Sequence, residues 1–542
     1  MKTTRKLLIL MLAIVLVVSL GLIGCTKKDP APTDKDSAAV QALKAGLKEL
    51  GLEKLPTVKL SYNTNDAHQK IAEAVQAMWQ EELGVDVQLN NMEWGAYLDT
   101  LSEGSFQIGR LGWLGDFMDP MTFLDFFITG GGNNDGSYSN AEYDSLINQA
   151  KATGDQEKRL EYLSKAEKIL LDEAGTAPIY FYTEVRVRQD YVKGAILHGD
   201  GSRDYTWTSI SDPAYDNNLI LNARQEPPSL DSATATDTTS FEILRLLQEG
   251  LTRLDKESEV TPGSGMAESW TVSEDALTYV FTLKDDIYWS NGDPVTAQDF
   301  EYAWKRVLNP DTAADYAYQM YVLKNGEKYN NGEATADQVG VKAMNAKTLK
   351  VDLEAPTPYF LQLTAFGSFY PVNEKVVKAN ANWAAEASTF VGNGPFKLQS
   401  WKHDDEVVVV KNDKYWDKDN VKLNSIKWVM VNDDNTAYQL YKNNEIHDDT
   451  APQELTYELL QKGEATSVPI LGTYMYLFNC EDEIFKNANI RKAFSLAIDR
   501  VAIVDQILKG GQLPATGYVP PGASPDMDVD FREYNGNLLE NK

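Results

Sequence analysis

The chain has 542 residues, of which 43% are hydrophobic and 24% are charged, as in ordinary globular proteins. This length exceeds what one hydrophobic core organises and predicts two or three domains. The 80 acidic residues outnumber the 51 basic residues and give a net charge of -29. That balance argues against a nucleic-acid partner, because no basic surface is available to neutralise phosphates.

The N-terminus has the pattern of a bacterial export signal. A basic start is followed by an apolar run at 7–23 and then by the letters LIGC, which end at Cys25. This order predicts a lipoprotein signal peptide and lipobox at 1–25, with Cys25 lipidated; a single transmembrane anchor is the alternative. A diacylglycerol carries two acyl chains, which suffice for stable anchoring. The polar segment 26–35 would then be a tether.

Strands and helices alternate in the first half of the chain. The pattern predicts a strand at 57–62, a helix at 66–83 capped by Asp66, and a strand at 85–89, which together form a βαβ unit with parallel strands. One face of that helix is apolar, formed by Ile71, Val75, Met78, Trp79 and Leu83. Further elements are expected at 140–152 and 155–173 (helices) and at 177–182 (strand).

The second half also mixes both kinds of element. Residues 277–283 alternate as a half-buried strand, and Thr296 with Asp299 has the spacing of a capping box. The helix that follows presents Phe300, Trp304 and Val307 on one face. The segments DEVVVVKND and SIKWVMV are further strand candidates. The sequence therefore predicts an α/β protein of several lobes.

No pattern of residues indicates catalysis, a metal or a cofactor. The four histidines are scattered singly, and no phosphate-binding glycine loop occurs. The segment 526–531 imitates the start of a calcium loop, but Phe531 and Asn537 stand where glycine and glutamate are needed. Cys480, the second of the two cysteines, is predicted to be a packed side chain, and the mature chain should hold no disulfide if Cys25 is lipidated.

Asp116 is the most informative single residue. It lies in LGWLGDFMDP, between aromatic residues and shortly after Arg110. A carboxylate in such surroundings needs a cation or shifts its pKa. An internal pair with Arg110 is one possibility, and a cation brought by a ligand is the other.

Several long segments carry a family resemblance. Residues 267–308 resemble the signature of the oligopeptide/dipeptide/nickel solute-binding proteins of bacterial ABC importers, and 225–231, 392–401 and 489–500 match further blocks of that family. Residues 93–123 resemble the ligand-contacting segment of its oligopeptide branch. Nearly the whole mature chain is covered.

The resemblance implies an α/β, three-lobed periplasmic-binding-protein-like fold, in which two closing lobes enclose a central cleft. The order of the segments is unusual, because the part resembling the end of the family comes first, which suggests a circularly permuted chain or a misassembled or engineered gene. The implied domains are domain III (36–183 and 472–542), domain I (184–254 and 373–471) and domain II (255–372).

The resemblance also assigns roles to single residues. Asp116 matches the aspartate that pairs with the α-ammonium of a bound peptide, while Arg110 would offset it in the empty state or meet a distant carboxylate. Gly112, Leu114 and Gly472 would offer main-chain groups to an extended peptide. Other matched ligand-binding positions are Trp94, Leu98, Trp113, Glu226, Tyr316, Asp448, Asp449, Thr450, Tyr474 and Met475. For each wall aromatic, plain core packing is the alternative.

The resemblance includes departures from the family. Relatives with a disulfide carry cysteines where Leu114 and Gly472 stand, and residues 448–450 replace a loop with tyrosine and asparagine. Met475 replaces another tyrosine. These differences leave peptide length and side-chain preference open.

We therefore expect a monomeric, extracytoplasmic lipoprotein, anchored to the cell membrane through Cys25, that captures short peptides and passes them to an ABC permease without a cofactor or any chemical reaction. The alternatives are a binding protein for a signalling peptide, a sugar or a metal chelate, a receptor that only signals, and an exported hydrolase.

Overall fold

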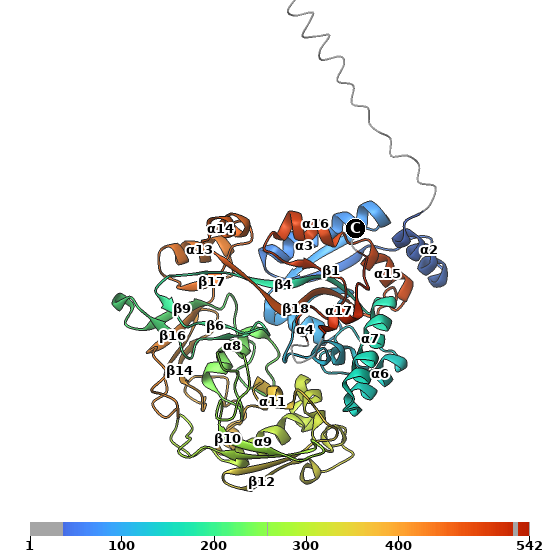
Figure 1. Cartoon of the computed structure of the whole chain (residues 1–542). Helices are drawn as coiled ribbons and strands as arrows, with labels where there is room; N and C mark the ends of the chain where they lie inside the picture. The colour runs from blue at the N-terminus through green and yellow to red at the C-terminus, as the bar shows by residue number, and fades with distance from the viewer. Residues whose placement is uncertain (1–35, 257, 524–528, 541–542) are drawn as a thin grey trace, which may run out of the picture.

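A computed structural model describes residues 36–540, apart from residue 257 and the segment 524–528. The predicted signal peptide, the tether and Cys25 lie outside the described residues. The chain has an α/β architecture, as predicted, with one long mixed sheet and a smaller antiparallel sheet (Figure 1). We name its three parts after a strand in each: the β1 lobe, the β9 lobe and the β11 lobe.

The long sheet joins the β1 lobe to the β9 lobe. Its strand order is β14-β15-β16-β9-β17-β4-β18-β3-β1-β2, with β19 added on β4. The strands are β1 (Val58–Asn63), β2 (Val87–Met92), β3 (Ile108–Leu114), β4 (Thr176–Arg188), β9 (Asn218–Asn222), β14 (Phe396–Lys402), β15 (Glu406–Lys411), β16 (Ser425–Val429), β17 (Asp448–Thr450), β18 (Thr466–Phe478) and β19 (Leu513–Pro514).

The predicted βαβ unit is confirmed at the start of the β1 lobe. Strands β1 and β2 are parallel, with Val58 opposite Val87, and α3 (Asp66–Leu83) connects them. The predicted cap is wrong by one residue: the side chain of Asn65 accepts the N–H groups of Ala67 and His68. Of the predicted apolar face, Ile71, Val75, Trp79 and Leu83 are buried, and Met78 is half-buried.

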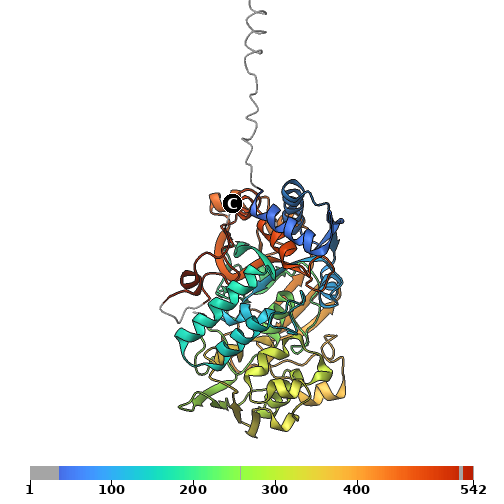
Figure 2. The same ribbon diagram turned by 90° about the vertical axis from the view of Figure 1, so that its right-hand side faces the viewer.

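Segments from both ends of the chain build the β1 lobe. Asn487, before α15, donates to Glu49 of α2 at 2.8 Å, and β18 pairs with β3. The start of α2 and the C-terminal end of the chain lie at the same end of the molecule in Figures 1 and 2. The helices of this lobe are α2 (Ala38–Leu50), α3, α4 (Trp94–Ser102), α5 (Met121–Leu124), α6 (Ala141–Ala152), α7 (Gln156–Asp172), α15 (Ala488–Leu496), α16 (Arg500–Ala502) and α17 (Phe531–Asn535), with η1 (Asp125–Phe127) and the π-helical η7 (Ile503–Leu508).

The β11 lobe lies at the bottom of Figure 1. Its antiparallel sheet has the order β10-β11-β13-β12 and packs under α9. The capping box of Thr296 and Asp299 is present, and Phe300, Trp304 and Val307 are buried, as predicted. The elements are β10 (Ala267–Val272), β11 (Thr278–Leu283), β12 (Val341–Asn345), β13 (Thr348–Asp352), α9 (Ala297–Val307), α10 (Gly326–Asn330), α11 (Phe360–Leu363), η3 (Pro310–Thr312), η4 (Asp315–Val322), η5 (Ala336–Gln338) and η6 (Gly367–Phe369).

The β9 lobe completes the sheet on the left of Figure 1. Strand β9 is parallel to β16 and carries α8 after it. The remaining elements are α8 (Thr238–Leu247), α12 (Glu374–Ala379), α13 (Asp434–Lys442), α14 (Thr456–Lys462), η2 (Pro213–Tyr215), and the short pairs β5 (Val192–Lys193) with β8 (Ser209–Ile210) and β6 (Ile196–Leu197) with β7 (Arg203–Asp204).

Strands β4 and β18 run side by side from the β9 lobe into the β1 lobe. Their pairing is interrupted between Pro469 and Thr473, so residues 470–472 of β18 have no partner in β4. The domain boundaries predicted after residues 183 and 471 fall inside these two strands. Both strands continue across these positions, and the domain boundaries remain a prediction.

Candidate functional site

One edge of β3 is open over half its length. Strand β1 pairs with β3 only at two positions, Leu60 with Ile108 and Ser61 with Gly109. From there to Leu114, no described strand covers that edge of β3, while β18 covers the other edge. Unpaired main-chain groups at a strand edge can accept another extended chain.

Two hydrogen bonds show which residues face the open edge. Gly115 donates its N–H to the carbonyl of Leu471 in the line of β18, at 2.8 Å. The Arg110 carbonyl instead points away from β18 and accepts the Tyr97 hydroxyl at 2.6 Å. Successive residues of a strand alternate in this respect. The even-numbered positions, among them Gly112 and Leu114, therefore turn their main-chain groups toward the open edge.

Asp116 lies in the turn that follows β3 and has neutral partners. Its carboxylate accepts the Tyr316 hydroxyl at 3.2 Å and the Gln319 amide at 2.6 Å, and its own N–H donates to Thr122 Oγ1 at 3.0 Å. Burial raises the pKa of Asp116 well above its ordinary value, and the nearby Asp125 carboxylate raises it further. Within the described chain, no hydrogen bond or ion pair joins Asp116 to Arg110.

A cavity of about 190 Å³ lies beside this carboxylate, and we call it the Asp116 cavity. All three lobes contribute aromatic side chains, with Tyr316 6.2 Å from Trp113 and 6.0 Å from Phe241 between ring centroids. Seven predicted residues line it: Trp94, Leu98, Gly112, Trp113, Leu114, Asp116 and Tyr316. Phe241, Phe366 and Ile470 line it as well and were not predicted. Besides these side chains, the lining includes the acids Glu184, Asp200, Asp237 and Glu242 and the cations Arg203 and Arg245. Aromatic walls with an excess of acids suit a small ligand bearing a cation.

Arg110 faces a second, more polar cavity of about 210 Å³, the Arg110 cavity. Its guanidinium donates to Tyr182 Oη at 2.7 Å and lies 4.7 Å from the Tyr474 ring centroid. The predicted Tyr474 therefore makes a cation–π contact with Arg110. Arg110 Nε is buried and has no hydrogen-bond partner in the part of the chain that the structure describes. The predicted Thr450 lines this cavity, and Arg203 and Glu242 line both cavities, which are therefore adjacent.

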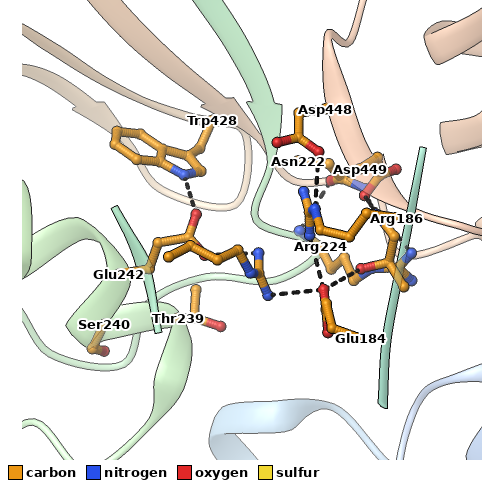
Figure 3. A network of polar contacts seen from close by, with 12 residues as sticks. Glu184, Arg186, Asn222, Arg224, Thr239, Ser240, Glu242, Trp428, Asp448 and Asp449 are labelled. Carbon is orange, nitrogen blue, oxygen red and sulfur yellow. Dashed lines mark hydrogen bonds and ion pairs between the residues drawn. The ribbon is translucent and has the colours of Figure 1, made fainter. Parts of the chain in front are cut away.

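A chain of ion pairs forms one wall of the Arg110 cavity (Figure 3). Arg203 lies 2.8 Å from Glu242 and 3.8 Å from Glu184, and Glu184 pairs with Arg186 at 2.9 Å. Arg224 of the same wall lies 3.8 Å from Asp449. These cations are compensated by resident acids. Arg110 differs, because none of its described contacts is with a carboxylate.

Some predicted residues do not line either cavity. Asp448 is fully buried and holds Arg186 and Arg188 at 2.9 and 2.8 Å. Glu226 accepts His403 Nδ1 at 2.7 Å. Gly472 lies in the interruption of β18, and Met475 is fully buried in the core. Asp449 forms an ion pair with Arg224 and lines neither cavity. These positions remain predictions without geometric support.

Histidine and cysteine side chains are also possible metal ligands in the part of the chain that the structure describes. The described residues contain no group of three His, Cys, Asp or Glu side chains that could hold a metal ion. His68 lines the Arg110 cavity, but burial lowers its pKa well below the ordinary value. Cys480 is half-buried, and burial raises the pKa of its thiol. Among the described helices, none has the length and apolarity to span a membrane.

Comparison with known proteins identifies relatives. The model of the bacterial extracellular solute-binding proteins, family 5 Middle, matches residues 24–135 and 261–540. A dipeptide-binding protein of Bacillus subtilis, DppE, is 46% identical over 341 residues, which are 63% of this chain and 62% of that relative. The chain thus spans less than two thirds of the relative's length.

Solved structures agree with this result. A periplasmic oligopeptide-binding protein of Borrelia burgdorferi is 30% identical, with a TM-score of 0.53 over 56% of this chain and 61% of that chain. Haemophilus influenzae OppA, solved in complex with the peptide RPPGFSPFR, is 28% identical, with a TM-score of 0.51 over 56% of this chain and 60% of that chain.

Proposed function

Since the chain belongs to family 5 of the bacterial extracellular solute-binding proteins, we propose that it captures short peptides and delivers them to an ABC importer. The observation that carries this proposal is the buried Asp116 carboxylate, which has neutral partners only and borders an aromatic cavity. A buried carboxylate without a cation is costly, and a peptide N-terminus supplies a cation without involving any side chain. Recognition of the α-ammonium would therefore be independent of peptide sequence.

The rest of the peptide would follow β3. Its backbone would pair with the open-edge groups of Gly112 and Leu114, which again do not discriminate between side chains. Its carboxylate would approach Arg110, whose Nε is buried and unpartnered. Asp116 and Arg110 are six residues apart, at most about 20 Å if fully extended. A peptide that bridges both groups would have no more than about six residues.

Binding would be coupled to closure of the lobes. Trp113, Phe241 and Tyr316 come from the three different lobes and meet at the Asp116 cavity. A ligand in contact with all three would favour the closed arrangement by its differential affinity for that state. The permease would then recognise the closed form, and the peptide would leave unchanged.

The anchoring and the segment order belong to the same proposal. Lipidation at Cys25 would hold the protein on the outer face of the cell membrane, and it would act there as a monomer without a cofactor. A permuted order is supported by the position of α2 next to the C-terminal end in Figures 1 and 2. A chain reopened between residues 210 and 212, with its present ends joined by a short linker, should fold and bind peptides equally well. Loss of folding would contradict the permutation.

The test of function is incubation of the purified protein with a mixed peptide library, followed by native mass spectrometry. We expect intact peptides of two to six residues to co-purify in a one-to-one complex. Cleaved peptides would indicate a hydrolase, and retention of a sugar or a metal chelate in place of peptides would indicate another ligand class.

A further inference from the structure

A third cavity lies on the other side of the Asp116 turn. Its volume of about 480 Å³ exceeds that of both cavities described above, and we call it the Asp125 cavity. Asp125 and Lys151 of the β1 lobe form one side, and Gln319 and Tyr359 of the β11 lobe form the other. The peptide path along β3 does not use it.

Two buried acceptor atoms on residues that line this cavity have no hydrogen-bond partner among the described residues. They are Asp125 Oδ1 and Gln319 Oε1, and the two side chains belong to residues that are only 7% and 4% exposed. Buried polar atoms are normally satisfied, so an unsatisfied pair calls for a missing partner. Because both atoms are acceptors, that partner must be a hydrogen-bond donor.

The charges around the cavity favour a cationic donor. Lys151 Nζ is 3.5 Å from the other oxygen of Asp125, which is longer than a normal hydrogen bond. Arg159, the other cation in the lining, is held by Asp119 at 2.9 and 2.6 Å. The rim adds three exposed acids: Asp315, Glu327 and Glu354. The cavity therefore has an excess of negative charge.

The walls favour an aliphatic stem behind that cation. Phe117 and Tyr359 stack at 4.3 Å between ring centroids, and Leu363 and Tyr318 continue the apolar surface. A ligand that fits both the polar groups of Asp125 and Gln319 and the apolar walls is amphiphilic, with an apolar chain ending in an ammonium group.

Gln319 forms the partition between this cavity and the peptide site. Its Nε2 donates to Asp116 at 2.6 Å, while its unpartnered Oε1 belongs to a side chain that lines the Asp125 cavity. Asp116 and Asp125 are close enough for each charge to act on the other site. An ammonium in either site would relieve the repulsion felt in the other.

We propose that the Asp125 cavity is a second cation site, which holds an alkylammonium group between Asp125 Oδ1 and Gln319 Oε1. This inference rests on the proposed function, because the group is supplied by a lysine side chain of the bound peptide. It gives a preference for lysine to a receptor whose main site ignores side chains. A free diamine offers the same chemistry and is the other possible source.

The experiment compares tetra-alanine peptides that carry lysine, or the uncharged isostere norleucine, at each position in turn. Calorimetry on the full chain should show that lysine binds about 10- to 100-fold more tightly than norleucine at one position, as expected for hydrogen bonds to a charged group. Asp125→Asn should abolish this preference, so that the lysine and norleucine peptides bind equally. Since Asp125 also acts on Asp116, the comparison is this ratio within each variant and not the absolute affinity for tetra-alanine. Lys151→Met should increase the preference, since it removes the competing cation. Asp172→Asn, an exposed acid of α7, is the control for net charge.

The outcomes separate the two proposals. If tetra-alanine binds and lysine has no advantage at any position, or if the advantage survives Asp125→Asn, this inference is overturned while the proposed function stands. If no peptide binds, the proposed function fails. In that case 1,5-diaminopentane alone tests the cavity: binding that Asp125→Asn weakens supports the cation site, and absence of binding overturns it. Should Asp125→Asn not fold, an unchanged lysine preference in Lys151→Met is sufficient to overturn the inference.

Discussion

Replacement of Asp116 by asparagine is the most direct perturbation of the proposed peptide site. The donors to its carboxylate in the described chain, Tyr316, Gln319 and Thr122, are all neutral, so a peptide ammonium would be its cationic partner. Removing one partner of a buried ion pair costs about 3–5 kcal/mol. The asparagine oxygen can still accept one hydrogen bond from the ammonium, which returns about 1 kcal/mol. The net loss should be about 2–4 kcal/mol, or roughly 30- to 1,000-fold in affinity.

The assay is isothermal titration calorimetry with trialanine and with N-acetyl-trialanine. The acetylated peptide has no ammonium, so Asp116→Asn should change its affinity by less than about 1 kcal/mol. Glu161→Gln removes an exposed carboxylate that pairs with Lys165 on α7 and serves as the charge control. An equal loss for both peptides in Asp116→Asn would refute the ammonium assignment, because the effect would then not depend on the charge of the ligand.

Three further predictions follow from the same geometry. The pKa of Asp116 is raised in the empty protein, so binding of an ammonium group should release a proton, and peptide affinity should increase as pH rises through that pKa. Calorimetry in buffers of different ionisation enthalpy measures the number of protons released, and binding without proton release would contradict this prediction. The pKa of Asp125 is raised from 3.8 to about 6, so the folded state binds that proton more tightly, and stability should fall by roughly 3 kcal/mol as pH rises from about 4 to above 6. Thermal unfolding should show that Asp125→Asn lacks this loss; identical pH profiles would argue against it. Gly112→Ala would bring a Cβ into steric conflict with Tyr182 Oη and should cost about 1–3 kcal/mol of stability. Gly95→Ala, whose Cβ would lie 3.5 Å from Glu93 Oε2, should cost little, and equal effects of the two substitutions in chemical denaturation would count against the close contact.

Local periodicity made several elements of the fold predictable. The apolar face of α3 and the capping box of α9 are set by residues a few positions apart, and both appear as expected. Strand β4 was expected at 177–182 but continues to Arg188. Its second half carries Glu184, Arg186 and Arg188, and such charges are seldom buried in a strand. They are accommodated because β17 supplies Asp448, a long-range contact that no local pattern contains.

The candidate site divides in the same way. Residues of one continuous segment, such as Gly112, Trp113 and Asp116, were predictable from the family resemblance and line one cavity together. Arg203 and Arg224 were missed because they come from separate parts of the β9 lobe, one on β7 and one after β9, and come together only in the lining of the Arg110 cavity. Met475 was predicted at the site from its matched position, yet the strand places it in the core.

The side-by-side passage of β4 and β18 between lobes has a consequence for how the proposed receptor could adapt. A movement of the β9 lobe against the β1 lobe would bend both strands where residues 470–472 have no partner in β4. Substitutions there would shift the equilibrium between open and closed forms, and would raise or lower the apparent affinity for every ligand by a common factor. The choice among cargoes would be made elsewhere, at the proposed sites around Asp116 and Asp125. Evolution or an engineer could therefore retune overall tightness and discrimination independently.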